Sequence, residues 1–112
     1  MPSPASQGAR YGAVKITAQN QFSPVIELAK GERYMVSVWD IDSMSMTVTV
    51  QRRIGASAAD IVAIDDIEGW RDVDTYTAAT EEDGVAACAC EMRIGVKTGG
   101  FTSGEAGARI AK

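Results

Sequence analysis

Met44-Ser45-Met46-Thr47-Val48-Thr49-Val50-Gln51 is the stretch that decides the fold class, because apolar and polar residues alternate along its whole length. Successive side chains of a β-strand point to opposite faces of the sheet. The four apolar side chains, from Met44 to Val50, would therefore face a core. The four polar ones, from Ser45 to Gln51, would face solvent. This stretch predicts one half-buried strand of an antiparallel sheet.

Shorter stretches of the same kind predict further strands. They lie at residues 13–18, 25–28, 34–39, 72–77, 85–97 (with an interruption around Glu91) and 106–111. Segments 25–28 and 34–39 are predicted to pair as a hairpin across a Lys30-Gly31-Glu32 turn, and residues 40–43 are predicted to end the second segment. Short strands separated by Gly, Asp and Ser turns are typical of an antiparallel β-sandwich. The sequence thus predicts an all-β protein of jelly-roll or immunoglobulin-like Greek key type.

The length of the chain, 112 residues, is that of one domain. We expect residues 10–112 to form a single β-sandwich domain. Residues 1–9 contain Pro, Ser and Gly and no strand pattern, so they are predicted to be a flexible N-terminal arm.

The composition narrows the classes of function. The chain has 11 basic and 15 acidic residues and a net charge of −4, whereas binding of nucleic acid needs a concentrated basic surface. The longest block of like charge, Glu81-Glu82-Asp83, is predicted to be a solvated loop. Histidine, the commonest general base and metal ligand, is absent. No stretch approaches the ~20 apolar residues that span a bilayer. We therefore expect no enzymatic activity, no cofactor, no metal site, and neither nucleic acid nor membrane as a partner.

Two groups of polar residues could each be a binding or catalytic site, or could be ordinary surface residues. The acidic residues that could form a carboxylate pair or bind a hard cation are Asp65, Asp66, Glu68, Asp72 and Asp74. They lack the placement of a glycosidase pair and the spacing of a calcium loop, so solvated loop charge is the favoured interpretation. The Lys-Thr-Gly-Gly sequence at residues 97–100 has the wrong residue order for a phosphate-binding loop, and it is predicted to be a glycine-rich hairpin turn.

Cys88 and Cys90 leave three interpretations open. The first is two small buried residues that behave as hydrophobic side chains. The second is a disulfide to a neighbouring subunit, formed after release into an oxidising medium. The third is a metal shared between subunits. A disulfide between the two is disfavoured, because residues two apart on a strand give a strained bond.

The aromatic residues also leave two interpretations open. They are Tyr34, Trp39, Trp70, Tyr76 and Phe101. Together they could form a platform on which sugars stack, but such residues more often fill a sandwich core or anchor an interface.

Three tracts carry a family resemblance. They are Thr47-Val48-Thr49-Val50-Gln51-Arg52, Trp70-Arg71-Asp72-Val73-Asp74-Thr75-Tyr76-Thr77, and Arg93-Ile94-Gly95-Val96-Lys97-Thr98-Gly99 followed by Phe101-Thr102-Ser103-Gly104. In these tracts the chain resembles small β-sandwich virion proteins of tailed bacteriophages, over residues 22–110. These are head decoration, neck or tail accessory components.

The resemblance implies a non-enzymatic structural protein of the virion, assembled in the host cytoplasm. The favoured role is a capsid decoration protein that binds the head surface and its own copies as a homo-oligomer. Its expected partners are the major capsid protein or neck proteins. One alternative is a neck or collar protein at the head–tail junction. Another is a module of a fibre that binds carbohydrate or the host surface.

The chain departs from this family in two places. Residues 53–69 are longer than the corresponding turn and contain four large apolar residues, Ile61, Val62, Ile64 and Ile67. These residues are a candidate subunit interface, or they cap one end of the core. Residues 85–90, which include both cysteines, replace a more polar approach to the penultimate strand.

Overall fold

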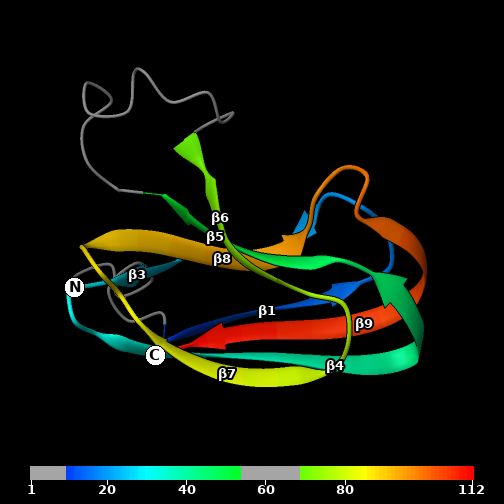
Figure 1. The fold of residues 1–112 in the computed structure, drawn as a ribbon, viewed down its shortest axis with the longest axis horizontal. Coiled ribbons are helices and arrows are strands. Elements are labelled where there is room, and N and C mark those ends of the chain that lie inside the picture. The colour runs from blue at the N-terminus through cyan, green and yellow to red at the C-terminus, as the bar shows by residue number, and fades with distance from the viewer. Residues whose placement is uncertain (1–9, 54–68) are drawn as a thin grey trace, which may run out of the picture.

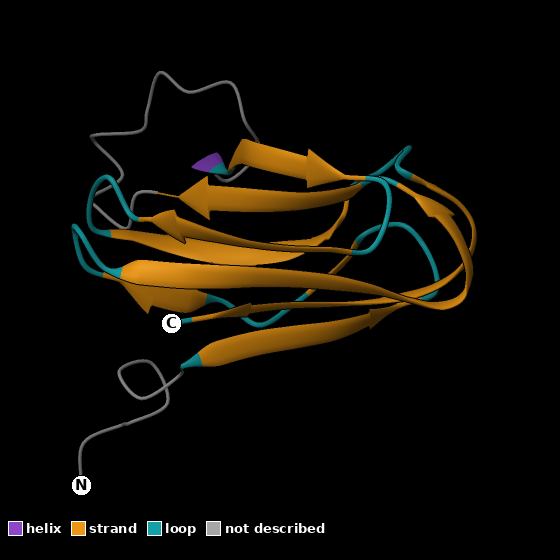
Figure 2. Cartoon of the chain, turned by 60° about the horizontal axis from the view of Figure 1, so that its bottom comes forward, coloured by secondary structure: helices purple, strands orange, loops and turns teal. Residues whose placement is uncertain are grey.

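The computed structural model describes residues 10–53 and 69–112, which form two antiparallel β-sheets packed face to face (Figure 1). The strands are β1 (Tyr11–Ile16), β2 (Gln21–Phe22), β3 (Ile26–Leu28), β4 (Arg33–Met46), β5 (Val48–Arg53), β6 (Arg71–Tyr76), β7 (Thr80–Val85), β8 (Cys90–Val96) and β9 (Phe101–Ala111). Figure 2 shows that both layers consist of strands. The predicted all-β sandwich is therefore confirmed. The predicted arm, residues 1–9, and the candidate interface residues Ile61, Val62, Ile64 and Ile67 lie outside the described residues.

The strand order identifies the type of sandwich. We call the sheet with the order β1-β9-β4-β7 sheet A, and the sheet with the order β2-β8-β5-β6 sheet B. Strands β2 and β3 both pair with β8, β2 near Val96 and β3 near Met92, so together they act as one interrupted edge strand. Of the described strands that follow one another in sequence, only β5 and β6 then pair with each other. In an immunoglobulin-like sandwich several consecutive strands pair, whereas this alternation between two sheets is that of a jelly roll.

Ser23 and Pro24 explain the interruption between β2 and β3. Proline has no N–H to donate to a ladder, so it is confined to sheet edges or breaks. The Ser23 N–H donates to the Ile94 carbonyl at 2.8 Å, and the Ile94 N–H donates to Ser23 Oγ at 3.1 Å. The serine hydroxyl thus takes the place of a backbone acceptor, and the buried β8 backbone stays paired.

The core lies between the sheets and receives alternate residues of the long strands. Its fully buried members include Ile16, Ile26, Val36, Val48, Val50, Met92, Ile94, Val96, Ala106, Ala108 and Ile110. The predicted alternation at residues 106–111 is confirmed within β9. Among the described residues, no helix is long and apolar enough to cross a membrane.

The stretch at residues 44–51 is not one strand, as predicted, but the corner between the sheets. β4 ends at Met46 in sheet A and β5 begins at Val48 in sheet B, with the Thr47 N–H donating to the Gly100 carbonyl at 2.7 Å. Thr49 and Gln51, expected to face solvent, are 1% and 5% exposed. The prediction was wrong here because side chains from neighbouring strands cover this part of the outer face of sheet B.

Three further expectations about the strands were wrong. β3 and β4 form no hairpin, since they belong to different sheets. β4 does not end at residues 40–43 but continues through them, with register shifts against β9 and a positive φ of 48° at Ser43. The interruption predicted around Glu91 within residues 85–97 lies earlier, since β7 ends at Val85 and β8 begins at Cys90.

The acidic run Glu81-Glu82-Asp83 is not a loop but part of β7, an edge strand of sheet A. Its side chains are exposed, as predicted. Charged residues are tolerated at a sheet edge, where they also discourage pairing with other chains.

Candidate functional site

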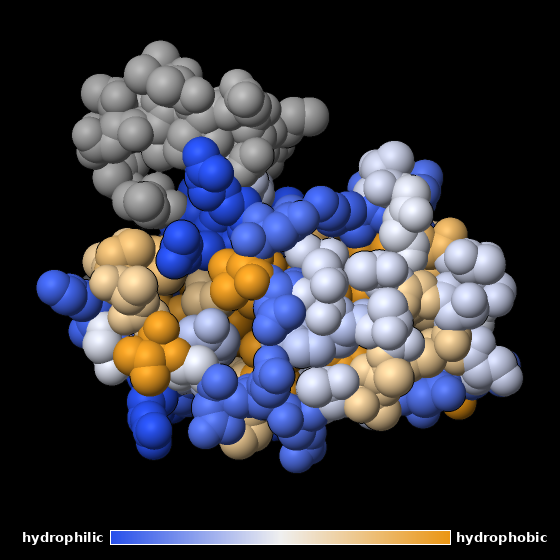
Figure 3. Space-filling model, viewed as in Figure 1, coloured by the Kyte–Doolittle hydropathy of each residue, from blue (hydrophilic) through white to orange (hydrophobic). Residues whose placement is uncertain are grey.

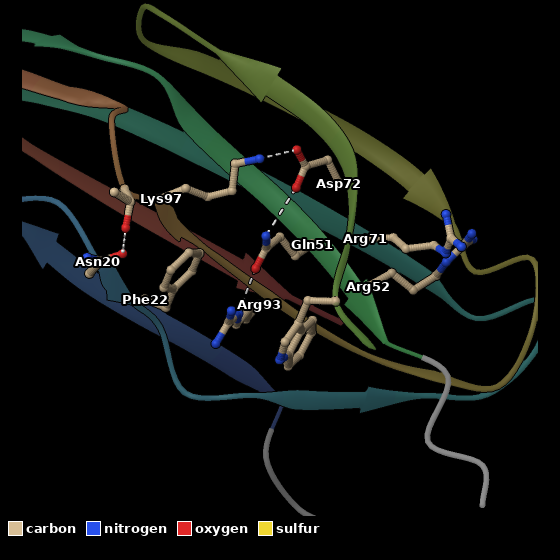
Figure 4. A pocket seen from close by; sticks show the side chains of 10 residues that line it. Asn20, Phe22, Gln51, Arg52, Arg71, Asp72, Arg93 and Lys97 are labelled. Atoms are coloured by element: carbon tan, nitrogen blue, oxygen red, sulfur yellow. Dashed lines mark hydrogen bonds and ion pairs between the residues drawn. The ribbon is translucent and has the colours of Figure 1, made fainter. Parts of the chain in front are cut away.

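A depression of about 850 Å³ lies on the outer face of sheet B (Figure 4). Its lining comes from β2, β5, β6 and β8 and the adjoining turns, and consists of Asn20, Phe22, Gln51, Arg52, Trp70, Arg71, Asp72, Arg93, Lys97 and Thr98. All of these except Asn20 and Phe22 belong to the three tracts that carry the family resemblance. The tracts therefore build a surface feature as well as a scaffold.

Four polar side chains form a hydrogen-bonded chain across the depression. The register places Gln51 opposite Asp72 of β6 and Arg93 of β8. The Lys97 Nζ contacts Asp72 Oδ2 at 2.5 Å, and Gln51 Nε2 donates to Asp72 Oδ1 at 3.1 Å. Arg93 Nε donates to Gln51 Oε1 at 2.9 Å. The buried Gln51 amide thus holds a carboxylate on one side and a guanidinium on the other (Figure 4).

The guanidinium of Arg93 is also held between two aromatic rings. Its Cζ lies 3.9 Å from the centre of the Phe22 ring and 4.2 Å from the centre of the Trp70 ring. Arg53 covers Trp70 as well, at 4.5 Å, and its Nη2 forms an ion pair with Glu91 at 2.8 Å. Cations over aromatic faces are attracted by the ring quadrupole. Arg93 is therefore fixed in place, and Trp70 is left only 5% exposed.

Asp72 is kept ionised by its neighbours. Partial burial raises the pKa of its carboxyl, but the hydrogen bonds from Lys97 and Gln51 and the charge of Lys97 outweigh burial and lower the pKa below its ordinary value. Its negative charge is engaged by Lys97, so Asp72 offers little compensation to the arginines nearby.

Arg52 and Arg71 lie at the border of the depression, and Figure 4 shows both side chains pointing away from the polar chain. They lie directly opposite each other on β5 and β6, and Arg52 is also opposite the buried Met92 of β8, so this pair lies on the other side of sheet B from Gln51 and Arg93. Within residues 10–53 and 69–112 neither guanidinium makes an ion pair or a side-chain hydrogen bond. Like charges directly opposite each other destabilise a sheet. Of the cationic residues at the depression, Arg93 and Lys97 thus share a face with Asp72, whereas Arg52 and Arg71 do not.

The outer face of sheet A differs in chemistry. Register places Tyr11, Ala111 and Met35 side by side in one row across β1, β9 and β4. Tyr11 and Met35 are 58% and 47% exposed. Trp39, 42% exposed, lies over Gly107, where the absence of a side chain leaves room for the indole. The Arg109 guanidinium lies 4.9 Å from the centre of the Tyr11 ring.

The edge of the molecule between β6 and β7 is a third, smaller feature. Figure 3 shows hydrophobic residues reaching the surface in several places among hydrophilic ones. Tyr76 Oη donates to Glu82 Oε1 at 2.8 Å and so joins the two edge strands. Burial, and then this hydrogen bond, raises the pKa of the Tyr76 phenol.

Cys90 is the first residue of β8, and Cys88 lies just before this strand. Cys90 is 5% exposed and pairs with Leu28, while Cys88 is half-buried against the core. Burial, followed by the neighbouring Cys88, raises the pKa of the Cys90 thiol. This placement favours the interpretation as small buried residues. The intersubunit disulfide remains a prediction. Among the residues the structure describes, no three metal-ligating side chains gather together.

The structure does not bring the aromatic residues together into a sugar-stacking platform. Trp39 lies on the outer face of sheet A, whereas Trp70 is buried under arginines on the outer face of sheet B. Tyr34 and Phe101 pack against the core.

The polar chain of the depression was missed by the sequence interpretation. Asp72 is exposed, in agreement with its interpretation as solvated charge, but its carboxylate is also held by Lys97 and Gln51. The signal was the alternation along β8 and into the residue that follows it, where Arg93 and Lys97 occupy outward positions and Met92, Ile94 and Val96 are buried. The predicted glycine turn after Lys97 is confirmed, with the Gly100 N–H donating to the Lys97 carbonyl at 2.9 Å, but it joins strands of different sheets.

Comparisons of this chain with protein-family models, with curated proteins and with solved structures found no match.

Proposed function

We propose that this chain is a non-enzymatic structural protein of a tailed-bacteriophage particle, which decorates the head surface and binds its own copies. The jelly roll is an architecture that virion proteins use, among others. The sequence resemblance to small β-sandwich virion proteins supports the same class of protein. Fold alone does not imply function, so the proposal depends on the surfaces that the fold presents.

The outer face of sheet A is the observation that carries the proposal. Tyr11, Met35 and Trp39 are each more than two-fifths exposed on this one face. The small residues Ala111 and Gly107 lie between them, and the Trp39 indole lies over Gly107 on the outer surface of the sheet. Clusters of exposed apolar residues on a soluble domain usually mark an interaction surface, and Trp, Tyr and Met are enriched in such surfaces.

Binding alone is sufficient for the proposed role. A protein that binds the assembled particle but not its separated subunits stabilises the assembled form by mass action. Repetition over a symmetric surface multiplies a modest effect at each site. No reactive group is needed for this mechanism.

The test is the amount and position of the protein in purified particles. We expect many copies spread over the head, measured by quantitative mass spectrometry against the major capsid protein and by electron microscopy of labelled particles. A single ring at the head–tail junction would support the neck alternative instead, and absence from the particle would refute the proposal.

A variant connects this test to sheet A. Trp39→Ser should reduce incorporation into particles, because it removes the largest exposed apolar side chain of the face. Val25→Ser is the matched control, since Val25 is an exposed apolar residue beside the edge of sheet B. Equal incorporation of both folded variants would show that sheet A is not the docking face.

A further inference from the structure

We propose that two copies of this chain pair through the outer face of sheet A, about a two-fold axis that runs along the strands between β9 and β4. This inference rests on the proposed function, because it names the partner of the same exposed face. That partner is a second copy of the chain. The reasons are the positions of the apolar side chains, the placement of the charges and the sizes of the side chains on the central strands.

The exposed apolar cluster reaches from one edge of sheet A to the other. Tyr11 belongs to edge strand β1, and Val85, 55% exposed, extends the cluster to edge strand β7. The register places Val85 opposite Arg33, two residues before Met35 on β4, so Val85 shares the outer face with Met35. Trp39 lies over Gly107 of the neighbouring β9. Apolar side chains thus lie on both sides of the line between β9 and β4, which is the middle of sheet A.

Two opposite charges also lie on the two sides of this line. One row across the sheet consists of Ala13, Arg109, Ser37 and Glu81, which come from β1, β9, β4 and β7. Arg109 and Glu81 are exposed, and neither forms an ion pair within residues 10–53 and 69–112. Because they are two strands apart, their backbones are separated by about 9.5 Å. Each charge is therefore left for a partner outside its own copy.

A two-fold axis along the strands brings these charges together between copies. Rotation about this axis places each row of the sheet over the same row of the second copy and reverses the order of the strands. β9 of one copy then lies over β4 of the other, and β1 lies over β7. Arg109 of each copy comes beside Glu81 of the other, so the same contact forms twice, as the symmetry of an isologous dimer requires. Complementary charges of this kind fix the register of an interface.

The side chains of the two central strands match in size under the same rotation. Met35 of one copy lies over Ala111 of the other, and Arg109 lies over Ser37. At both positions a long side chain meets a short one, so the faces can approach to the spacing of about 10 Å at which sheets pack. The Trp39 indole lies over Gly107 of its own copy and hence near the axis, where it meets its counterpart.

The area of the face predicts a weak dimer. Four strands about 4.8 Å apart, side by side over six residues of about 3.4 Å each, give a face of about 400 Å². Pairing covers this face on both copies, about 800 Å² in total, which is small for a specific interface. Association in solution should therefore depend strongly on concentration. On a particle, a dimer that is held through both copies gains from the high local concentration of its second copy.

The test is sedimentation equilibrium of the full chain from about 10 μM to about 1 mM, the range of weak association. The ionic strength is kept low, because salt screens exposed charges. We expect the wild type to form dimers reversibly. Arg109→Glu and Glu81→Arg should each weaken association by about tenfold or more, since each places like charges beside one another twice. Glu27→Arg is the matched control, because Glu27 is an exposed acidic residue of β3 in sheet B, and it should leave association unchanged.

The sharpest measurement mixes the two weakened variants. In a pair of one Arg109→Glu copy and one Glu81→Arg copy, both contacts again join opposite charges. The mixture should therefore associate about as strongly as the wild type, although each variant alone does not. Both variants keep a negative net charge, since the wild type has −4 and each substitution changes the charge by 2. Attraction between the molecules as a whole would not explain restored association.

Three results would overturn the inference. They are a wild type that stays monomeric over this range, a mixture that associates no better than its components, and equal weakening by Glu27→Arg and Glu81→Arg. Each differs from a failure of the proposed function, which is measured on particles. A monomeric chain that still covers heads would refute the dimer alone, and a dimer that is absent from particles would refute the proposed function alone.

Discussion

Gly95 of β8 lies beneath Phe22, and Gly107 of β9 lies beneath Trp39. Both strands lie inside their sheets, but we expect the substitution of alanine for these two glycines to lower the free energy of unfolding by very different amounts. A Cβ added at Gly95 would collide with the backbone of β2, at the Gln21 carbonyl and at the Phe22 Cα, the latter at 2.6 Å. A Cβ added at Gly107 would meet the indole of Trp39, for example its Nε1 at 2.5 Å. Backbone that is held in a ladder cannot move without losing hydrogen bonds, whereas an exposed indole can turn away.

The cost of Gly95→Ala can be worked out from the bonds that β2 would lose. The affected hydrogen bonds are Asn20 N–H to the Val96 carbonyl, Ser23 N–H to the Ile94 carbonyl, and Ile94 N–H to Ser23 Oγ. At about 1 kcal/mol each, with about 1–3 kcal/mol for overpacking, the expected loss is about 4–6 kcal/mol. That is a large part of the about 5–15 kcal/mol by which domains are stable.

The cost of Gly107→Ala should be about 1 kcal/mol or less. Alanine is favoured over glycine in a strand by roughly 0.5–1 kcal/mol, which offsets part of the lost contact with Trp39. Urea unfolding followed by far-ultraviolet circular dichroism measures both free energies. In Gly95→Ala we also expect the stacking of Phe22 on Arg93 to be lost, visible as a shift of the Arg93 Nε–Hε signal. Equal destabilisation by the two substitutions would refute the distinction between backbone and side-chain contacts.

Three further predictions concern the core, the polar chain and the thiols. Ile94→Ala should cost about 2–5 kcal/mol in urea unfolding, because Ile94 is fully buried, while Ile41→Ala at an exposed position of β4 should stay within about 0.5 kcal/mol. The pKa of the Asp72 carboxyl is lower in the folded chain than its ordinary value of 3.8, so its ionised form stabilises the fold at neutral pH, and this contribution disappears as the pH falls below that value. Wild type should accordingly lose more stability than Asp72→Asn on acidification, and parallel curves would contradict the role of the Lys97 contact. Cys88 should react with a thiol reagent before Cys90, because Cys90 is buried and its pKa is raised. Non-reducing electrophoresis of purified particles tests the intersubunit disulfide, and a lack of cross-linked bands would exclude it.

The sequence was sufficient to predict the fold class but not the pairing of strands. Alternation predicts which side chains share a face, and this prediction was correct for β9. It does not state which strand lies beside which, so β3 and β4 were wrongly paired although they lie in opposite sheets. At Thr47 the chain passes from sheet A to sheet B while apolar residues continue at every second position, and this pattern conceals the corner.

The depression could not be predicted because it depends on register between distant segments. Gln51, Asp72 and Arg93 are 21 and 42 residues apart in their hydrogen-bonded pairs. In the sequence, each of these three residues looks like an ordinary polar residue that faces solvent. Only the placement of β5 between β6 and β8 makes them neighbours, and this placement is a property of the whole jelly roll.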